Sequence, residues 1–527
     1  MRYIDLIADR PLIWGLFLAY MVATGWLAWL GHKKTDDIKS FAIGRGDLHP
    51  AIVGITLAAA ICSTATFVIN PGFVFVHGVS ALMHMGVAAG LGIAAGLFLM
   101  SPGFRRVGAE TGALTLPQWL GNRFGSRALG VFFAVVSLLS LSFVVLIVGG
   151  ISIVLQKTLG LTNMEALVLT IVFVFSYITV GGAYAHVYTN TLQGAIMIVV
   201  TAVILASGLR YVFAGDFWSK ISAVDANLTS AVNPASNLFG GFFSVYVAGF
   251  VIGFAAVCQP HIMSKALYVK TDRDVRRYLW VAVGVTTLFL GLLFVGLFAH
   301  AAGVPAGTRQ DAVMTVYITQ AFPTPVVAVI TVALLAASMS TLDGILVALS
   351  SIAANDLFLG VAEKRWLANH SPEARARLAH KVSQVVVVAL GIVAFAIAAN
   401  PPKLLGIFGQ VGVYGLIAAS AVPILVGVLV PRAGAGTAFA AAIVGLVVHF
   451  GLYIWGAYDA AAARAYSLAN PGVTGTWALL ASGLVAIAVL VISANRGGAT
   501  VSASTAGPSW PAARPQTHSP RTARSGS

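Results

Sequence analysis

Stretches of about 20 mostly apolar residues, each long enough to cross a lipid bilayer as a helix, recur along this chain from residue 11 to about residue 494. Only 9% of its 527 residues are charged, whereas ordinary soluble domains contain about 25%. The gaps between the apolar runs are too short for a soluble domain. We therefore predict an all-α polytopic membrane protein, with a single transmembrane domain over residues 1–494 that lies in a lipid bilayer.

The apolar runs predict about thirteen transmembrane helices. The first run is too long for the core of a signal peptide and has no small-residue cleavage pattern, so we expect it to remain as a helix. The segment 307–323 is too polar to span and is predicted to form an external helix. The tail 495–527 is rich in Ser, Thr, Pro, Ala and Arg, which predicts disordered chain. The predicted spans are 11–31, 51–77, 81–103, 127–155, 164–181, 187–213, 238–262, 277–302, 325–356, 381–399, 403–430, 435–457 and 473–494.

Basic residues alternate between rich and poor loops along the chain. The net charge of +14 would suggest a nucleic-acid partner in a soluble protein, but the sequence has no basic stripe interleaved with aromatic residues, so we expect no nucleic-acid binding. By the positive-inside rule the rich loops are cytoplasmic. This places the N-terminus outside and the C-terminus in the cytoplasm, in a bacterial inner membrane. The rich loops contain Lys33, Lys34, Lys39 and Arg45; Arg105, Arg106, Arg123 and Arg127; Lys265, Lys270, Arg273, Arg276 and Arg277; and Lys364, Arg365, Arg375, Arg377 and Lys381.

Two apolar runs are interrupted by residues that a regular membrane helix avoids. Run 51–79 contains "CSTAT" at 62–66 and "NPG" at 70–72, while run 239–263 contains several glycines and "QPH". Non-helical backbone at membrane depth is tolerated where it is buried in protein or lines a cavity. With the first span set aside, these runs are the first and sixth helices of a ten-helix core over 51–430. Their placement predicts a 5+5 inverted repeat with a binding site between two discontinuous helices.

The run "LLAASMSTLDGILVALSS" (334–351) carries five hydroxyls and one carboxylate in an apolar helix. A single Ser or Thr in such a helix can bond back to a carbonyl four residues earlier. Ala337, Ser340 and Thr341, however, share one helix face. The carboxylate of Asp343 cannot be hidden in this way and is costly within a membrane. Hydroxyls beside carbonyls freed by the first broken helix would suit a hard cation such as Na⁺.

Four stretches together resemble one known family. They are "AASMSTLDGILVALSSIAANDLF" (336–358), "YITVGGAYAHVYTNTLQGAIMI" (177–198), "LTLPQWLGNRFGS" (114–126) and "QPHIMSKAL" (259–267). They are similar to motifs of the sodium:solute symporters, and the resemblance covers roughly residues 40–430. It implies a leucine-transporter-type fold, Na⁺ as the co-transported ion and a small organic solute as substrate. The sodium ligands that it implies are the carbonyls of Ala59, Cys62 and Ala337 and the hydroxyls of Ser340 and Thr341.

The resemblance also implies solute contacts from the broken segments and from the second and tenth core helices. Core packing remains an alternative for Phe254, a back-bonded hydroxyl for Thr66, and a structural role for His84, which is isolated on an apolar span. Gln410, between glycines, has the stronger case because a buried amide needs partners. The implied solute residues are Thr64, Thr66, His84, Phe254 and Gln410.

The chain departs from the family at a position where some members hold a second cation. The usual Tyr-Thr-Asp motif here reads Tyr188, Thr189, Asn190. The amide keeps an acceptor but lacks the charge, and Asp343 on the facing helix is a possible substitute carboxylate. Asn190 and Asp343 are therefore candidates for a second cation site, although we predict one sodium ion per cycle.

The sequence thus predicts a sodium-coupled symporter that imports a small organic solute by alternating access, with a slight preference for a carboxylate. No enzyme activity is expected, since the sequence contains no HExxH, phosphate-loop or Gly-x-Ser-x-Gly motif. A solute or sodium sensor on the same fold and a proton-coupled transporter are the alternatives. A channel is not expected, because it would need a continuous polar pore with rings of charge, whereas these spans carry isolated polar clusters. The sequence favours no oligomeric state.

Overall fold

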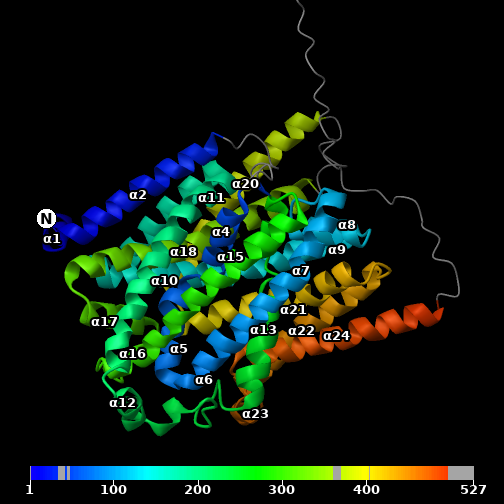
Figure 1. Ribbon diagram of the computed structural model, residues 1–527. Coiled ribbons are helices and arrows are strands. Elements are labelled where there is room, and N and C mark those ends of the chain that lie inside the picture. The colour runs from blue at the N-terminus through cyan, green and yellow to red at the C-terminus, as the bar shows by residue number, and fades with distance from the viewer. Residues whose placement is uncertain (1, 34–41, 44–47, 360–369, 403, 497–527) are drawn as a thin grey trace, which may run out of the picture.

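Every regular element that the computed structural model describes is a helix, and the helices pack side by side in a bundle (Figure 1). The predicted all-α class is therefore confirmed. The single transmembrane domain over 1–494 stays a prediction, and nearly all of the predicted tail 495–527 lies outside the described residues. The described residues are 2–33, 42–43, 48–359, 370–402 and 404–496.

Ten helices of the described chain are long and apolar enough to cross a membrane, and two bent helix pairs pass the same test as one span each. A shorter apolar helix covers Asn163–Thr179. The predicted number of thirteen spans requires this shorter helix to cross as well, so it stays a prediction.

The first half of the chain forms the N-terminal helix and the first repeat of the core. Its elements are α1 (Arg2–Asp9), α2 (Pro11–His32), α4 (Pro50–Ile61), η1 (Ala65–Ile69), α5 (Asn70–His77), α6 (Val79–Leu82), η2 (Met83–Ala88), α7 (Ala89–Thr111), α8 (Leu116–Arg123), α9 (Arg127–Val136), η3 (Ser137–Ser140), α10 (Leu141–Leu159), α11 (Asn163–Val212), α12 (Phe217–Val224) and η4 (Ala226–Thr229).

The second half forms the second repeat and two further long helices. Its elements are η5 (Phe243–Val247), α13 (Ala248–Ala256), α14 (Pro260–Met263), η6 (Ser264–Tyr268), α15 (Asp272–Leu290), η7 (Gly291–Phe294), α16 (Val295–Ala301), η8 (Gln310–Ala312), α17 (Val313–Ala321), α18 (Thr324–Ile352), η9 (Ala353–Leu359), α20 (Pro372–Ala399), α21 (Leu405–Leu429), α22 (Ala435–Tyr458), α23 (Ala460–Tyr466) and α24 (Pro471–Arg496).

Both predicted discontinuous helices are bent in the structure. α4 ends before Cys62, whose ψ of 85° leaves the helical range, and the two halves of this span meet at 56°. In the second span Gln259 is extended at ψ 141°, because a residue before proline is disfavoured in the α region. The halves of that span meet at 59°. The similar bends at corresponding places agree with the predicted repeat of two five-helix units.

Not every interruption in the two runs breaks the helix. The "NPG" stretch does not, because η1 continues directly into α5, with Pro71 in the first turn of that helix. Gly249 and Gly253 lie inside α13 and serve close packing instead. A Cβ on Gly249 would lie 2.7 Å from the carbonyl oxygen of His84, and one on Gly253 would collide with the backbone of Ala89. Small residues thus let α13 pack closely against η2 and α7.

One glycine divides the longest helix of the bundle. α11 covers both predicted spans 164–181 and 187–213, but Gly182 within it has φ 55° and ψ −145°. Only glycine adopts this region without strain. The chain therefore turns at Gly182, and the two parts of α11 can act as separate spans.

Basic side chains fasten the helices at one end of the bundle. Arg105 donates to the carboxylate of Asp272 and to the carbonyl of Lys270 at 2.8 Å, which joins α7 to the start of α15. Arg123 donates to the carbonyls of Gly427 and Val430, at 2.6 and 2.8 Å, at the end of α21. Figure 1 shows α8 and α9 at this end, and α12, α17 and α23 at the other.

The start of α2 and the helix α17 lie at the end of the bundle opposite α8 and α9 (Figure 1). Arg10, at the start of α2, donates to the carbonyls of Lys157 and Thr158, at 3.1 and 2.7 Å, at the end of α10. α17 forms the regular part of the segment 307–323 and has only nine residues, too few to span. The segment contains a short helix at the end opposite α8 (Figure 1), and its position outside the membrane, as an external helix or lid, stays a prediction.

Candidate sodium and solute site

Four of the hydroxyl groups of α18 fall into two kinds. Ser338 donates to the carbonyl of Leu334 at 2.8 Å, and Ser350 to that of Val347 at 3.2 Å, so both satisfy themselves within their own helix. Ser340 and Thr341 instead reach across to α4. The two kinds have similar sequence surroundings, and the face of the helix on which each hydroxyl lies decides its partner.

Ser340 and Thr341 meet the end of α4. The hydroxyl of Ser340 lies 2.9 Å from the carbonyl oxygen of Ala59 and 2.8 Å from that of Ala337. The hydroxyl of Thr341 lies 3.3 Å from the carbonyl oxygen of Ala59 and 3.0 Å from that of Ala60. All five residues are fully buried. The structure therefore brings together four of the five predicted ligand residues and adds Ala60.

The carbonyl oxygens at the end of α4 have hydroxyl groups, rather than backbone N–H groups, as their donors in the described residues. The last backbone bond recorded for α4 runs from the N–H of Cys62 to the carbonyl of Ala58 at 2.9 Å, so the carbonyls that follow Ala58 lie beyond the helical ladder. Two hydroxyl hydrogens are then shared among the carbonyls of Ala59, Ala60 and Ala337. Such a buried group of carbonyl and hydroxyl oxygens suits a cation, because hard cations prefer oxygen ligands.

Cys62, the fifth predicted ligand, lies directly at the break and is buried. Its non-helical ψ turns its carbonyl away from the axis of α4. The carbonyl of Ala60 was not predicted as a ligand. The frayed last turn of a helix that ends in "CST" exposes several consecutive carbonyls, so that signal was available in the sequence.

The two candidates for a second cation lie beside this cluster, between α11 and α18. Asp343 accepts from the hydroxyl of Tyr177 at 2.6 Å and from that of Thr189 at 3.2 Å. The Asn190 amide donates to the backbone carbonyl of Ser340 at 3.1 Å, and its own oxygen has no hydrogen-bond partner among the described residues. Both carboxylate oxygens therefore already have donors, and the arrangement fastens α11 to α18.

One predicted solute residue, Thr64, lies close to the first break, and another, Gln410, lies on a helix that packs against the second half of that span. Thr64 follows the break, and its buried hydroxyl has no hydrogen-bond partner among the described residues. Its methyl group fills the space that Gly150 of α10 leaves open. Gln410 is half-buried on α21. Gly406, one turn before Gln410, lies against Ile69 of η1.

The other three predicted solute residues have packing roles in the structure. His84 lies in η2, where its Nδ1 is 2.7 Å from the carbonyl of Ser244 and its ring tilts against Phe239. Thr66 is buried in η1, and Phe254 is half-buried on the face of α13 that packs against α7. The solute roles of His84, Thr66 and Phe254 stay predictions, and the contacts of His84 are those of a structural histidine.

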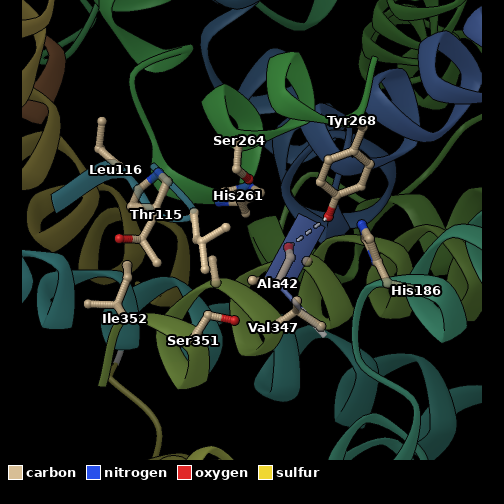
Figure 2. A pocket seen from close by; sticks show the side chains of 14 residues that line it. Ala42, Thr115, Leu116, His186, His261, Ser264, Tyr268, Val347, Ser351 and Ile352 are labelled. Carbon is tan, nitrogen blue, oxygen red and sulfur yellow. Dashed lines mark hydrogen bonds between the residues drawn. The ribbon is translucent and has the colours of Figure 1, made fainter. Parts of the chain in front are cut away.

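A second set of buried polar groups was missed by reasoning from sequence. Lys265, counted there among the basic loop residues, is in fact 1% exposed and lies 2.8 Å from Nε2 of His186 and 3.3 Å from the hydroxyl of Thr56. Its burial in the structure corrects the prediction, made from the sequence, that groups Lys265 with the charged loop residues. His186, His261 and Ser264 line a small pocket that Figure 2 shows from close by.

The comparisons with known proteins agree with this geometry. A model of the sodium:solute symporter family matches residues 41–445. The chain belongs to the sodium:solute symporter family. This confirms the resemblance found in the sequence motifs. It also makes the protein a sodium-coupled symporter, with Na⁺ as the co-transported ion, in a family of transporters rather than enzymes.

Individual relatives of this symporter cover most of its length. The sodium/pantothenate symporter of Haemophilus influenzae is 26% identical over 446 residues, 83% of this chain and 88% of the relative. The sodium/proline symporter of Escherichia coli (strain K12) is 27% identical over 410 residues, 74% of this chain and 77% of the relative. Bacterial relatives agree with a plasma-membrane location.

The fold has also been seen in a solved structure. A Na⁺-coupled sialic acid symporter in a substrate-bound outward-open state has a TM-score of 0.70 to this symporter at 17% sequence identity. The match covers 90% of this chain and 98% of the other. The leucine-transporter-type fold predicted from the sequence is therefore confirmed.

Proposed function

We propose that this symporter imports a small organic solute that bears a carboxylate, and that it binds one sodium ion between the end of α4 and the hydroxyls of α18. The proposal rests above all on the meeting of the Ser340 and Thr341 hydroxyls with the carbonyls of Ala59 and Ala60. In this proposal the carbonyls of Cys62 and Ala337 complete the set of sodium ligands.

Sodium binding would act on the shape of the first broken span. When the ion is bound, the hydroxyl oxygens of Ser340 and Thr341 and the carbonyl oxygens at the end of α4 all face it. α4 is then held against α18, with the break at Cys62 fixed. Because η1 begins three residues after Cys62, a fixed break also fixes the backbone beside Thr64.

Solute binding would follow from that fixed geometry. The free energy of coupling between the two sites is reciprocal, so a solute that binds better beside the sodium-loaded break must also tighten sodium binding. Rocking of the two repeats about the site would then expose both sodium and solute to the cytoplasm. The sodium gradient supplies the driving force, and no covalent step is involved.

Two observations support a carboxylate on the solute. The second half of the first broken span runs from Ala65 to His77, and the N-terminal end of such a helix favours negative charge. The named relatives are symporters of proline and pantothenate, which are both small carboxylates. Thr64 and Gln410 would donate hydrogen bonds to the solute. The buried hydroxyl of Thr64 has no hydrogen-bond partner among the described residues. Gln410 carries an amide on α21, which packs against the first broken span at Gly406.

The orientation is also part of the proposal. Arg105 and Arg123 lie at one end of the bundle with the start of α15, while Arg10 lies at the other end with Lys157. By the positive-inside rule the first end is cytoplasmic. The N-terminus would then be outside, with the whole of 1–494 as one transmembrane domain.

Uptake by purified protein in proteoliposomes tests the proposal. We expect an inward sodium gradient to drive accumulation of a radiolabelled small carboxylate from a panel that includes proline and pantothenate, and a potassium gradient to drive none. Neutral sugars serve as the comparison class. Sodium-driven accumulation of a sugar alone would contradict the carboxylate, and uptake that ignores the sodium gradient would contradict the coupling.

A further inference from the structure

Lys265 is a buried lysine without a carboxylate in contact. It lies in η6, after the break of the second bent span, and is 1% exposed. Among the residues that the structure describes, no carboxylate oxygen lies within 4 Å of its Nζ. The recorded hydrogen-bond partners of that Nζ are Nε2 of His186 on α11, at 2.8 Å, and the hydroxyl of Thr56 on α4, at 3.3 Å. An ammonium buried in this way is costly unless its charge is compensated.

The Lys265–His186 pair can carry one positive charge or be neutral. A charged ammonium only donates, so His186 must then be neutral with a free lone pair on Nε2. If the ammonium loses its proton, the hydrogen bond survives in reverse, with Nε2–H donating to the amine. Two charged groups would place donors against each other at 2.8 Å, so the doubly charged state is excluded. The pair can therefore exchange a proton without losing its contact.

One residue of the pair borders the pocket in Figure 2. His186 lies on the wall of that pocket, together with His261, Ser264 and Ser351 (Figure 2). The pocket is also lined by Thr115, the residue before α8, so it lies toward the basic end of the bundle. A proton released by the pair would reach the cytoplasm under the proposed orientation.

The titratable groups around the pair come from three elements, α18, α14 and η6. Asp343 of α18 is next to Gly344, which packs against the His186 ring, where a Cβ would lie 3.1 Å from Cε1. His261 of α14 lies on the same pocket wall. The ring of Tyr268, in η6 itself, lies 5.2 Å from Nζ, and α4 contributes the uncharged Thr56.

Thr56 connects this pair to the proposed sodium ligands. It lies three residues before Ala59 on α4, about 5 Å along the helix axis. We propose that Lys265 and His186 form a proton-binding site that competes with sodium, so that loss of its proton to the cytoplasmic pocket raises the affinity for sodium. This inference rests on the proposed sodium site, because a bound Na⁺ and a charged pair repel each other across one turn of α4.

Sodium titrations of the full-length protein at a series of pH values test this inference. Purified protein in detergent is heated with increasing NaCl at constant ionic strength, from about pH 6 to about pH 9, and the sodium concentration for half-maximal stabilisation is measured. We expect the apparent sodium affinity to rise several-fold with pH, by at most about tenfold per pH unit for one competing proton. In Lys265→Met the affinity should be high and nearly independent of pH.

Three further variants keep the test decisive. Lys265→Arg keeps the positive charge throughout, so its sodium affinity should stay low at every pH, which distinguishes it from Lys265→Met even if one of them folds poorly. Lys157→Met removes an exposed lysine at the other end of the bundle, and His449→Gln removes a buried histidine of α22; both should titrate like the unchanged protein.

The possible results separate the two proposals. Equal pH dependence in the unchanged protein and Lys265→Met, or sodium affinity that does not vary with pH in the unchanged protein, overturns the proton site and leaves the sodium site standing. Absence of any stabilisation by sodium at every pH overturns the sodium site itself, and the proton competition with it.

Discussion

Residues of one chemical type take different roles on α18 because of where they face. Ser338 and Ser340 are two residues apart and both fully buried. Ser338 donates to its own helix, whereas Ser340 lies between the carbonyls of Ala59 and Ala337. The role of a buried hydroxyl is therefore decided by the acceptors that surround it, and not by how deeply it is buried.

Replacement of both hydroxyls at the α4 contact tests the sodium ligands. We expect Ser340→Ala with Thr341→Ala to abolish stabilisation by sodium, because two of the proposed oxygens are removed. Sodium-dependent thermal shifts measure the loss. Ser338→Ala is the matched control, since the carbonyl of Leu334 keeps its helical N–H partner. A normal sodium response in the double variant would show that the ion binds elsewhere.

The carboxylate of Asp343 gives a second prediction. We expect Asp343→Ala to lower the thermal stability, because the buried hydroxyl of Tyr177 would lose its acceptor, at about 1–3 kcal/mol for a group left unpaired. Asp343→Asn keeps one acceptor and should be milder. With one sodium ion per cycle, the sodium dependence of Asp343→Asn should keep the steepness of the unchanged protein. A fall in steepness would indicate that Asp343 holds a second cation.

At the scale of elements, two bent spans and one close helix contact organise the site. The bends free carbonyls at the end of α4 and place Lys265 beside α11. Gly249 and Gly253 let α13 pack tightly against η2 and α7. Without a hydrophobic driving force between helices in lipid, such close packing is a main source of their association.

The contact between α13 and α7 can be tested by adding one methyl group. Gly253→Ala should destabilise the protein by about 1–3 kcal/mol, because the methyl would overlap the backbone of Ala89 and force the helices apart. Gly284→Ala on α15 is the control, since nothing lies within 4 Å of the added Cβ. Thermal denaturation should show a lower midpoint for Gly253→Ala alone. Equal midpoints would mean that the two helices have room to separate.

At the scale of the whole molecule, the positions of the charged residues predict how it lies in the membrane. The two native cysteines, Cys62 and Cys258, are buried, so background labelling should be low. We expect a membrane-impermeant maleimide to label Ser222→Cys on α12 in intact cells, and Arg276→Cys on α15 after permeabilisation alone. The reverse pattern would overturn the proposed orientation.

The sequence by itself determined the membrane class, the family, the two broken spans and the face of Ser340 and Thr341. These features depend on local composition, on helical spacing and on interruptions such as "CST" and "QP" that weaken a helix. Only the tertiary structure decided that Lys265 is buried between Thr56 and His186, and that Asp343 accepts from Tyr177 and Thr189. Each of these contacts joins helices far apart in the chain, and local spacing carries no information about which distant side chain will lie opposite.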